Sequence, residues 1–235
     1  MKKVVSIILA VFSLVNCFSQ SSEEYCKKAV DKERILDHKG AIAEYNRAIQ
    51  LSTSNVNAYY GRALCKDKLQ DYKGAMTDYN KAIQLDPKNA QVYYNRGVCM
   101  DKQKDYKGAI EDLTKAIELN PKYEDAYYNR GICRDELHDY LAAIEDYNKV
   151  IKLDRKNELA YYNRGICKAK MEDNRGAIAD LDIAISLNPK YVQAYFIRGL
   201  CKNALGYRDS GCMDFSKAGD LGHDDAFSMI KKYCN

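Results

Sequence analysis

The chain has 235 residues, of which 46% are hydrophobic and 30% are charged, and this composition is that of a globular protein with enough apolar residues to bury a core. Its formal net charge is +4, and this falls to about +2 (4 − 2) if Lys2 and Lys3 are removed with the amino-terminal segment. A charge so close to neutral excludes the basic footprint of a nucleic-acid-binding protein.

Residues 1–20, MKKVVSIILAVFSLVNCFSQ, have the order of a secretory signal peptide. Two lysines precede the apolar run 4–15, which is too short for a comfortable membrane span of ~20 residues. We expect cleavage near Ser19 and Gln20, and export to the periplasm or beyond the cell without a stable membrane span. Two alternatives remain open. Cys17 resembles the lipid-attachment site of a bacterial lipoprotein, although Asn16 is unusual before such a cysteine, and an uncleaved segment would act as an anchor.

From Ser22 onward the sequence repeats itself every 34 residues. The string YYNRG at 93–97, for example, returns at 127–131 and at 161–165. A period of this length indicates stacked repeats rather than one globular core. We therefore divide the chain into six repeats, followed by a closing segment at 226–235: 22–55, 56–89, 90–123, 124–157, 158–191 and 192–225.

Each repeat contains two helical patterns. In the repeat 90–123 the second pattern ends before Pro121, which cannot donate the next backbone hydrogen bond. Its apolar residues recur at spacings of three and four, which is typical of one buried helical stripe: Ala109, Ile110, Leu113, Ala116, Ile117 and Leu119. A glycine inside the first pattern, such as Gly97, costs roughly 1 kcal/mol, and this cost is tolerable if it lets two helices touch, with alanines facing it.

The small residues Gly97, Ala109 and Ala116, the aromatic Tyr93 and the closing Pro121 resemble the tetratricopeptide repeat, over about 204 of 235 residues (22 to 225). The resemblance implies an all-α fold, a right-handed α-solenoid of six stacked antiparallel helix pairs whose inner face usually binds peptides or proteins. Apolar residues at a helical spacing after residue 225 predict a C-terminal capping helix that covers the last exposed core surface: Ala226, Phe227, Met229 and Ile230.

The first helices supply the candidates for this inner face. We expect one ring of each tyrosine pair to pack in the core and the other to lean toward the groove, next to an asparagine whose amide can bind an extended peptide backbone. The candidate groove residues are Tyr60, Tyr94, Asn95, Tyr128, Asn129, Tyr162, Asn163 and Phe196. Gly61 and Ile197 interrupt the asparagine column at its two ends. The alternative is that the tyrosines fill space between stacked helices and the asparagines bond to neighbouring turns.

A charge pair recurs at the same two sites of every repeat. We expect it to join the two helices of a repeat as an exposed ion pair, in preference to binding an anionic ligand. The pairs are Lys28 with Glu44, Arg62 with Asp78, Arg96 with Asp112, Arg130 with Asp146, Arg164 with Asp180 and Arg198 with Asp214.

Five of the nine cysteines recur at the repeat period: Cys65, Cys99, Cys133, Cys167 and Cys201. Equivalent sites on stacked helices lie at least ~8–10 Å apart, whereas a disulfide needs Cα atoms within ~7 Å, so we expect these residues to be small packing groups. Cys212 and Cys234 lie outside the series and are our disulfide candidate in an oxidising compartment.

No catalytic, phosphate-binding or metal-binding motif appears, so we expect no enzyme, no cofactor and no metal. The groove face carries no single sign of charge, which disfavours a carboxylate clamp. We therefore expect an exported scaffold that binds a protein or peptide of unknown identity. The alternatives are a structural accessory of a bacterial envelope complex, which would use the convex face or the ends, and a glycan or small-ligand binder.

Overall fold

The computed structural model describes residues 21–234. The predicted signal peptide, its expected cleavage site and the lipid alternative at Cys17 therefore lie outside the described residues. Within 21–234 all regular structure is helical, with thirteen helices and no strand, which confirms the predicted all-α fold. None of the described helices is both long enough and apolar enough to cross a membrane.

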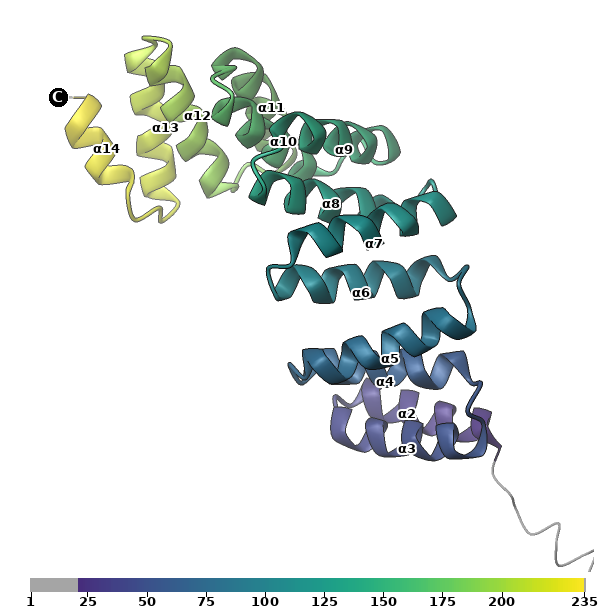
Figure 1. The fold of residues 1–235 in the computed structure, drawn as a ribbon. Helices are drawn as coiled ribbons and strands as arrows, with labels where there is room; N and C mark the ends of the chain where they lie inside the picture. Colours follow the sequence, from purple (N-terminus) through teal and green to yellow (C-terminus); the bar gives the residue numbers. More distant parts are fainter. Residues whose placement is uncertain (1–20, 235) are drawn as a thin grey trace, which may run out of the picture. The chain divides into compact units, whose positions relative to one another are not determined.

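Figure 1 shows the helices as successive pairs joined by short turns. Each 34-residue period holds two of them, and a last helix follows. Their bounds are α2 (Ser22–Arg34), α3 (His38–Leu51), α4 (Val56–Lys68), α5 (Tyr72–Leu85), α6 (Ala90–Lys102), α7 (Tyr106–Leu119), α8 (Glu124–Glu136), α9 (Tyr140–Leu153), α10 (Glu158–Lys170), α11 (Asn174–Leu187), α12 (Val192–Ala204), α13 (Arg208–Asp220) and α14 (Ala226–Tyr233).

The described helices fall into two compact units, and the division lies within α6. One unit extends to Asn95 and the other begins at Arg96. In each unit consecutive helices pack against one another, as in a tetratricopeptide solenoid.

Aspartates start most of the second helices. The carboxylate of Asp71 accepts a hydrogen bond from the backbone N–H of Gly74 at 3.0 Å, and Asp173 accepts one from Gly176 at 2.9 Å. Such an N-cap satisfies a backbone donor that the helix leaves unpaired and is worth about 1 kcal/mol. The residue before each of these two caps has a positive φ, 64° at Gln70 and 65° at Glu172, and Gly206 takes the same place, at 81°, in the turn between α12 and α13. The sequence thereby fixes where each hairpin turns.

The core lies between the two helices of each pair. Fully buried alanines line it, and the largest fully buried rings come from the second helices: Tyr79, Tyr147 and Phe215. Gly131 of α8 faces one of them, because a Cβ there would lie 2.8 Å from Cε1 of Tyr147. The expected close approach at the helical glycines is therefore present, but the group opposite Gly131 is a ring and not an alanine.

Helix α14 packs on α13 at the end of the chain. The ring of Tyr233 stacks on that of Phe215 with centroids 6.3 Å apart, and Arg208 Nε donates a hydrogen bond to the Tyr233 carbonyl oxygen. Ala226 is buried, but Phe227 is 69% exposed. Only part of the expected apolar stripe therefore covers the core, because Phe227 projects toward solvent.

Candidate functional site

Tyrosines and asparagines of successive first helices are joined by hydrogen bonds. Nδ2 of Asn163 on α10 donates to the hydroxyl of Tyr128 on α8 at 2.9 Å. Nδ2 of Asn95 likewise donates to the hydroxyl of Tyr60 on α4 at 2.8 Å, and also to the backbone carbonyl of Gln91. The amide donors therefore serve the chain itself. The amide carbonyls remain as the groups with which these side chains would accept a bond from a partner.

Asn129 also bonds within its own helix, because its Nδ2 donates to the backbone carbonyl of Asp125 at 2.9 Å. A bond to a carbonyl four residues earlier fixes the side chain against the helix surface. The alternative interpretation expected the asparagines to bond to neighbouring turns. The bonds of Asn95 and Asn129 to their own helices agree with that interpretation.

The groove tyrosines are half-buried by packing against their neighbours. The ring of Tyr128 lies 6.0 Å from that of Tyr147, and the ring of Tyr162 lies 4.5 Å from that of Tyr191. Burial raises the pKa of Tyr60 to about 12 and also raises the pKa of Tyr128 and of Tyr162. These rings therefore stay neutral, and Tyr60 and Tyr128 each combine a packing role with a hydroxyl that accepts a hydrogen bond.

Phe196, the last candidate of the series, stacks on His223 with centroids 3.9 Å apart and ring planes inclined by 10°. His223 lies in the turn between α13 and α14. Phe196 also lies 5.7 Å from Phe215, so much of its surface is taken up by the last helix pair.

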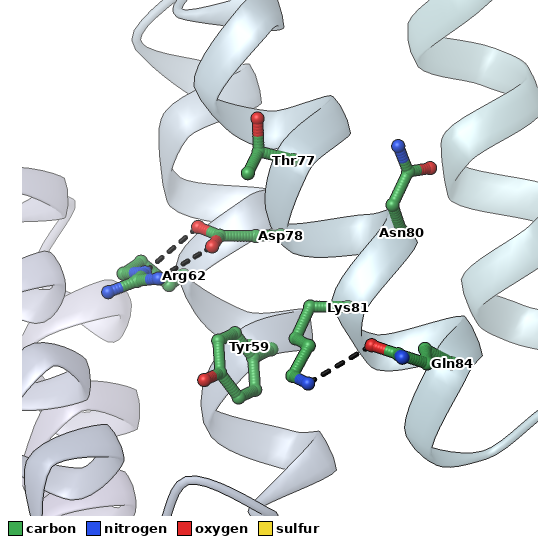
Figure 2. A pocket seen from close by; sticks show the side chains of 7 residues that line it. All are labelled: Tyr59, Arg62, Thr77, Asp78, Asn80, Lys81 and Gln84. Carbon is green, nitrogen blue, oxygen red and sulfur yellow. Dashed lines mark hydrogen bonds and ion pairs between the residues drawn. The ribbon is translucent and has the colours of Figure 1, made fainter.

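The recurrent charge pairs join the two helices of a repeat. Arg62 of α4 donates from Nε and Nη2 to the carboxylate of Asp78 on α5, at 2.8 and 2.6 Å, and from Nη1 to Oδ1 of Asn46 at 2.6 Å. Figure 2 shows this pair within a cavity of about 530 Å³ lined by α4 and α5. The other cation there, Lys81, donates to Gln84 at 3.0 Å. Because both cations are already bonded, the cavity is poorly suited to an anion.

These carboxylates are buried and not exposed as the sequence analysis expected. The side chain of Asp146 is 2% exposed and that of Asp78 is 3% exposed. A second cation one turn after the arginine completes most of the pairs, at 2.7 or 2.8 Å from the carboxylate: Lys66, Arg134, Lys168 and Lys202. Met100 stands at this position in the third repeat. The network is therefore a buried structural element, and the small stabilisation typical of exposed ion pairs does not describe it.

For the charge pair of the first repeat, the prediction was wrong about one partner, Lys28. Glu44 is bound by Lys32 at 3.3 Å and by Arg47 at 2.9 Å, whereas Lys28 lies over the ring of Tyr25. Lys32 occupies the site of the second cation, because it precedes Lys66 by one period. The first repeat thus keeps the second cation of the network and lacks the arginine.

The five periodic cysteines are buried and are free thiols. Cys133 Sγ donates to Oδ1 of Asp101, one repeat earlier, at 3.6 Å. Burial, together with the charge of Asp101 and this hydrogen bond, raises the pKa of Cys133 to about 12. Burial and Asp135 do the same to the pKa of Cys167. Outside this series, Cys212 and Cys234 form a disulfide with Cα atoms 5.8 Å apart.

A second cavity, of about 370 Å³, opens between the first helices α10 and α12. Lys170 and Asn174 lie among its lining residues, but most of its walls are apolar. The apolar lining residues are Ile166, Ala169, Ile197, Leu200, Cys201 and Ala204. Ile197 stands one period after Asn163, so the cavity lies where the asparagine column ends. The sequence analysis named Ile197 as a break in the asparagine column but did not predict the cavity.

No group of three or more metal-ligating side chains occurs among residues 21–234. The carboxylates of this part of the chain are instead distributed along the repeats, where Asp78 and Asp146 pair with cations and Asp71 and Asp173 cap helices. The arrangement offers hydrogen-bonding and apolar surfaces for recognition.

Comparisons with known proteins identify the repeats. A family model described as tetratricopeptide repeat matches residues 90–123 and 124–157, and a TPR repeat model matches residues 68–103. The chain therefore contains tetratricopeptide repeats. No curated protein sequence matches it significantly.

Solved structures show the same fold. A crystal structure of MamA is 27% identical with a TM-score of 0.69, covering 73% of this chain and 93% of that one. YrrB, described as a TPR protein with an unusual peptide-binding site, is 21% identical with a TM-score of 0.71, covering 80% of this chain and 97% of that one. PilF of Pseudomonas aeruginosa is 18% identical with a TM-score of 0.75, covering 90% of this chain and 97% of that one. The last two likenesses show the fold alone.

Proposed function

We propose that this chain is an exported scaffold that binds a protein or peptide partner along the face formed by its first helices. The observation that carries the proposal is the bond between Asn163 and Tyr128, which holds both side chains in place and leaves an amide carbonyl to accept from a partner. Side chains fixed in advance lose little conformational entropy when a partner binds. YrrB, which has the same fold, is described as having a peptide-binding site, and this supports peptide binding as a function of the fold.

The proposal includes the candidate groove residues named above, in two roles. The asparagines present hydrogen-bonding groups, and the rings present contact surface within each unit, from Tyr60 and Tyr94 in one unit and from Tyr128 and Tyr162 in the other. Phe196 contributes least to this surface, because His223 already covers one face of its ring.

A peptide-capture experiment tests this function. Short random peptides are selected on the wild-type chain, and their affinities are then measured for Asn163→Ala. We expect weaker binding with little change in melting temperature, because the lost bond to Tyr128 is only partly buried. Lys152→Ala, an exposed change on α9, is the matched control and leaves binding unchanged. Failure of the wild-type chain to select any peptide would overturn the proposed function.

Export is the second part of the proposal. The order of residues 1–20 supports it, and so does the Cys212–Cys234 bond, since disulfides persist in oxidising compartments. Expression of the whole sequence in a bacterial host, followed by fractionation and mass spectrometry of the amino terminus, tests it. A mature chain that begins near Gln20 supports simple secretion, a lipid on Cys17 supports anchoring, and an intact terminus in the cytoplasm contradicts export.

A structural accessory of an envelope complex is the second candidate function. Large apolar side chains exposed near the carboxyl end favour it, since Met213 is 73% exposed and Phe227 is 69% exposed. Pull-downs with Asn163→Ala separate the two functions, because a partner bound at this end is retained by the variant.

A further inference from the structure

The cavity between α10 and α12 arises where three positions depart from the repeat pattern. Ala169 stands one period after Asp135, which itself follows Asp101 by one period. Ile197 stands one period after Asn163, and Ala204 one period after Lys170. A carboxylate, an amide and an ammonium group are thus replaced by two methyl groups and an aliphatic side chain. All three replacements line the same cavity of about 370 Å³.

The loss of the carboxylate also ends the series of bonds between thiols and acids. Cys133 and Cys167 each lie against an aspartate of the preceding repeat, but the corresponding position before Cys201 is Ala169. Cys201 therefore contributes a buried, protonated thiol to the cavity wall, since burial raises its pKa to about 11. A thiol of this kind behaves as a small apolar group.

The charges around the cavity are neutralised within the chain. Lys170, at its edge, is held by Asp135 at 2.7 Å. On the helices that form the cavity, Lys168 is paired with Asp180 and Lys202 with Asp214, each at 2.8 Å. A charged side chain entering the cavity would lose its hydration without gaining a counter-ion, which is costly. An uncharged side chain meets no such cost.

We propose that this cavity binds an aliphatic side chain, such as leucine, isoleucine or methionine, of a partner peptide whose backbone continues toward Asn163. The inference rests on the proposed function and specifies which partners the groove accepts. Aliphatic walls favour an aliphatic anchor, whereas a tyrosine or tryptophan would bury a hydroxyl or an indole N–H that needs a partner. Ile197 interrupts the asparagine column at this point, so recognition changes there from hydrogen bonding to apolar contact.

Restoring the repeat pattern tests the proposal. Ala169→Asp returns the carboxylate of the preceding repeats and places a charge in the cavity. Short random peptides selected on the wild-type chain should share an aliphatic residue, and Ala169→Asp should weaken their binding about tenfold or more. Ser186→Asp on the exposed surface of α11 adds the same charge elsewhere and serves as the matched control, with affinity unchanged. Ala204→Lys is a second variant, used if Ala169→Asp fails to fold, with the same expected loss.

The outcomes separate this inference from the function on which it rests. If the wild-type chain selects no peptide, both the proposed function and the inference fail. If selected peptides need Asn163 but share no aliphatic residue and bind the cavity variants as well as wild type, the inference alone fails. Enrichment of aromatic or charged residues at the position sensitive to Ala169→Asp also overturns it.

Discussion

The thiol of Cys133 lies 3.6 Å from a carboxylate oxygen of Asp101, on the first helix of the preceding repeat. A thiol that donates to a carboxylate stays protonated, because the thiolate would face a like charge. Since the thiolate is the reactive form of cysteine, this contact makes a buried residue still less reactive. The chain can therefore carry free thiols together with its Cys212–Cys234 disulfide.

We predict that Asp101→Asn lowers the pKa of Cys133 from about 12, although burial still keeps that pKa above its ordinary value. The expected result is faster alkylation of Cys133 by iodoacetamide at mildly alkaline pH, measured by peptide mass spectrometry. Cys201 provides an internal control, because Ala169 stands where its carboxylate would be. An equal increase at both cysteines would indicate general loosening of the fold and would contradict the electrostatic explanation.

We predict that Asp146→Ala strongly destabilises the chain. Asp146 accepts from Arg130 at 2.7 Å and from Arg134 at 2.7 Å, and its side chain is 2% exposed. Its removal leaves two cations unpaired at a buried site, and losses of this kind cost about 3–5 kcal/mol. Urea denaturation measures the change, with Glu118→Ala as the control. Glu118 belongs to an exposed pair with Lys115, for which the expected cost is at most ~1 kcal/mol. Similar losses for both variants would show that burial adds nothing to the Asp146 network.

We predict that Glu44 makes the stability of the chain sensitive to acid. Burial by itself would raise the pKa of Glu44, but the hydrogen bonds and charges of Arg47 and Lys32 outweigh it and hold the pKa below its ordinary value. The carboxylate therefore contributes stability above its unfolded-state pKa, and this contribution is lost as the pH falls through the folded-state pKa.

Thermal melts across the acid range check this prediction. Glu44→Gln should be less stable than the wild-type chain near neutral pH, and the difference should shrink as the pH falls below about 4. A difference that stays constant with pH would show that the proton uptake of Glu44 does not depend on folding.

We predict that loss of the Cys212–Cys234 bond loosens α14 and leaves the middle of the chain unchanged. The bond closes a separation of 22 residues, and loops of this size contribute roughly 3 kcal/mol in the chain-entropy account. Hydrogen exchange of the double variant Cys212→Ser, Cys234→Ser should increase in Ala226–Tyr233 and stay the same in α8 to α11. Increased exchange throughout would contradict a local role for the bond.

The period of 34 residues predicted the helical hairpins well, because a repeated pattern averages out local ambiguity. The charge network was predicted only in part. Lys28 and Lys32 lie one turn apart on the same helix, so the repeat register alone did not show which of them meets Glu44. A signal for the second cation was nevertheless present, since Lys66 and Arg134 recur four residues after their arginines.

The cavity escaped prediction because it is defined by side chains that are missing. The side chains of Ala169 and Ala204 carry no functional group. Only comparison with Asp135 and Lys170, one period earlier, shows that these two alanines are unusual. The packing of Phe196 on His223 escaped for another reason. It joins a helix to a turn that follows the next helix, and such a contact depends on tertiary structure that the period does not encode.

The Cys212–Cys234 disulfide between α13 and α14 also restricts where such a chain can gain further repeats. Duplication of a repeat among the central hairpins preserves every interface, because each new copy has the same neighbours as the old one. A copy added after α13 would instead separate Cys212 from Cys234 and leave Tyr233 without the ring of Phe215. Evolution can therefore lengthen this protein upstream of α12 without disturbing its carboxyl end.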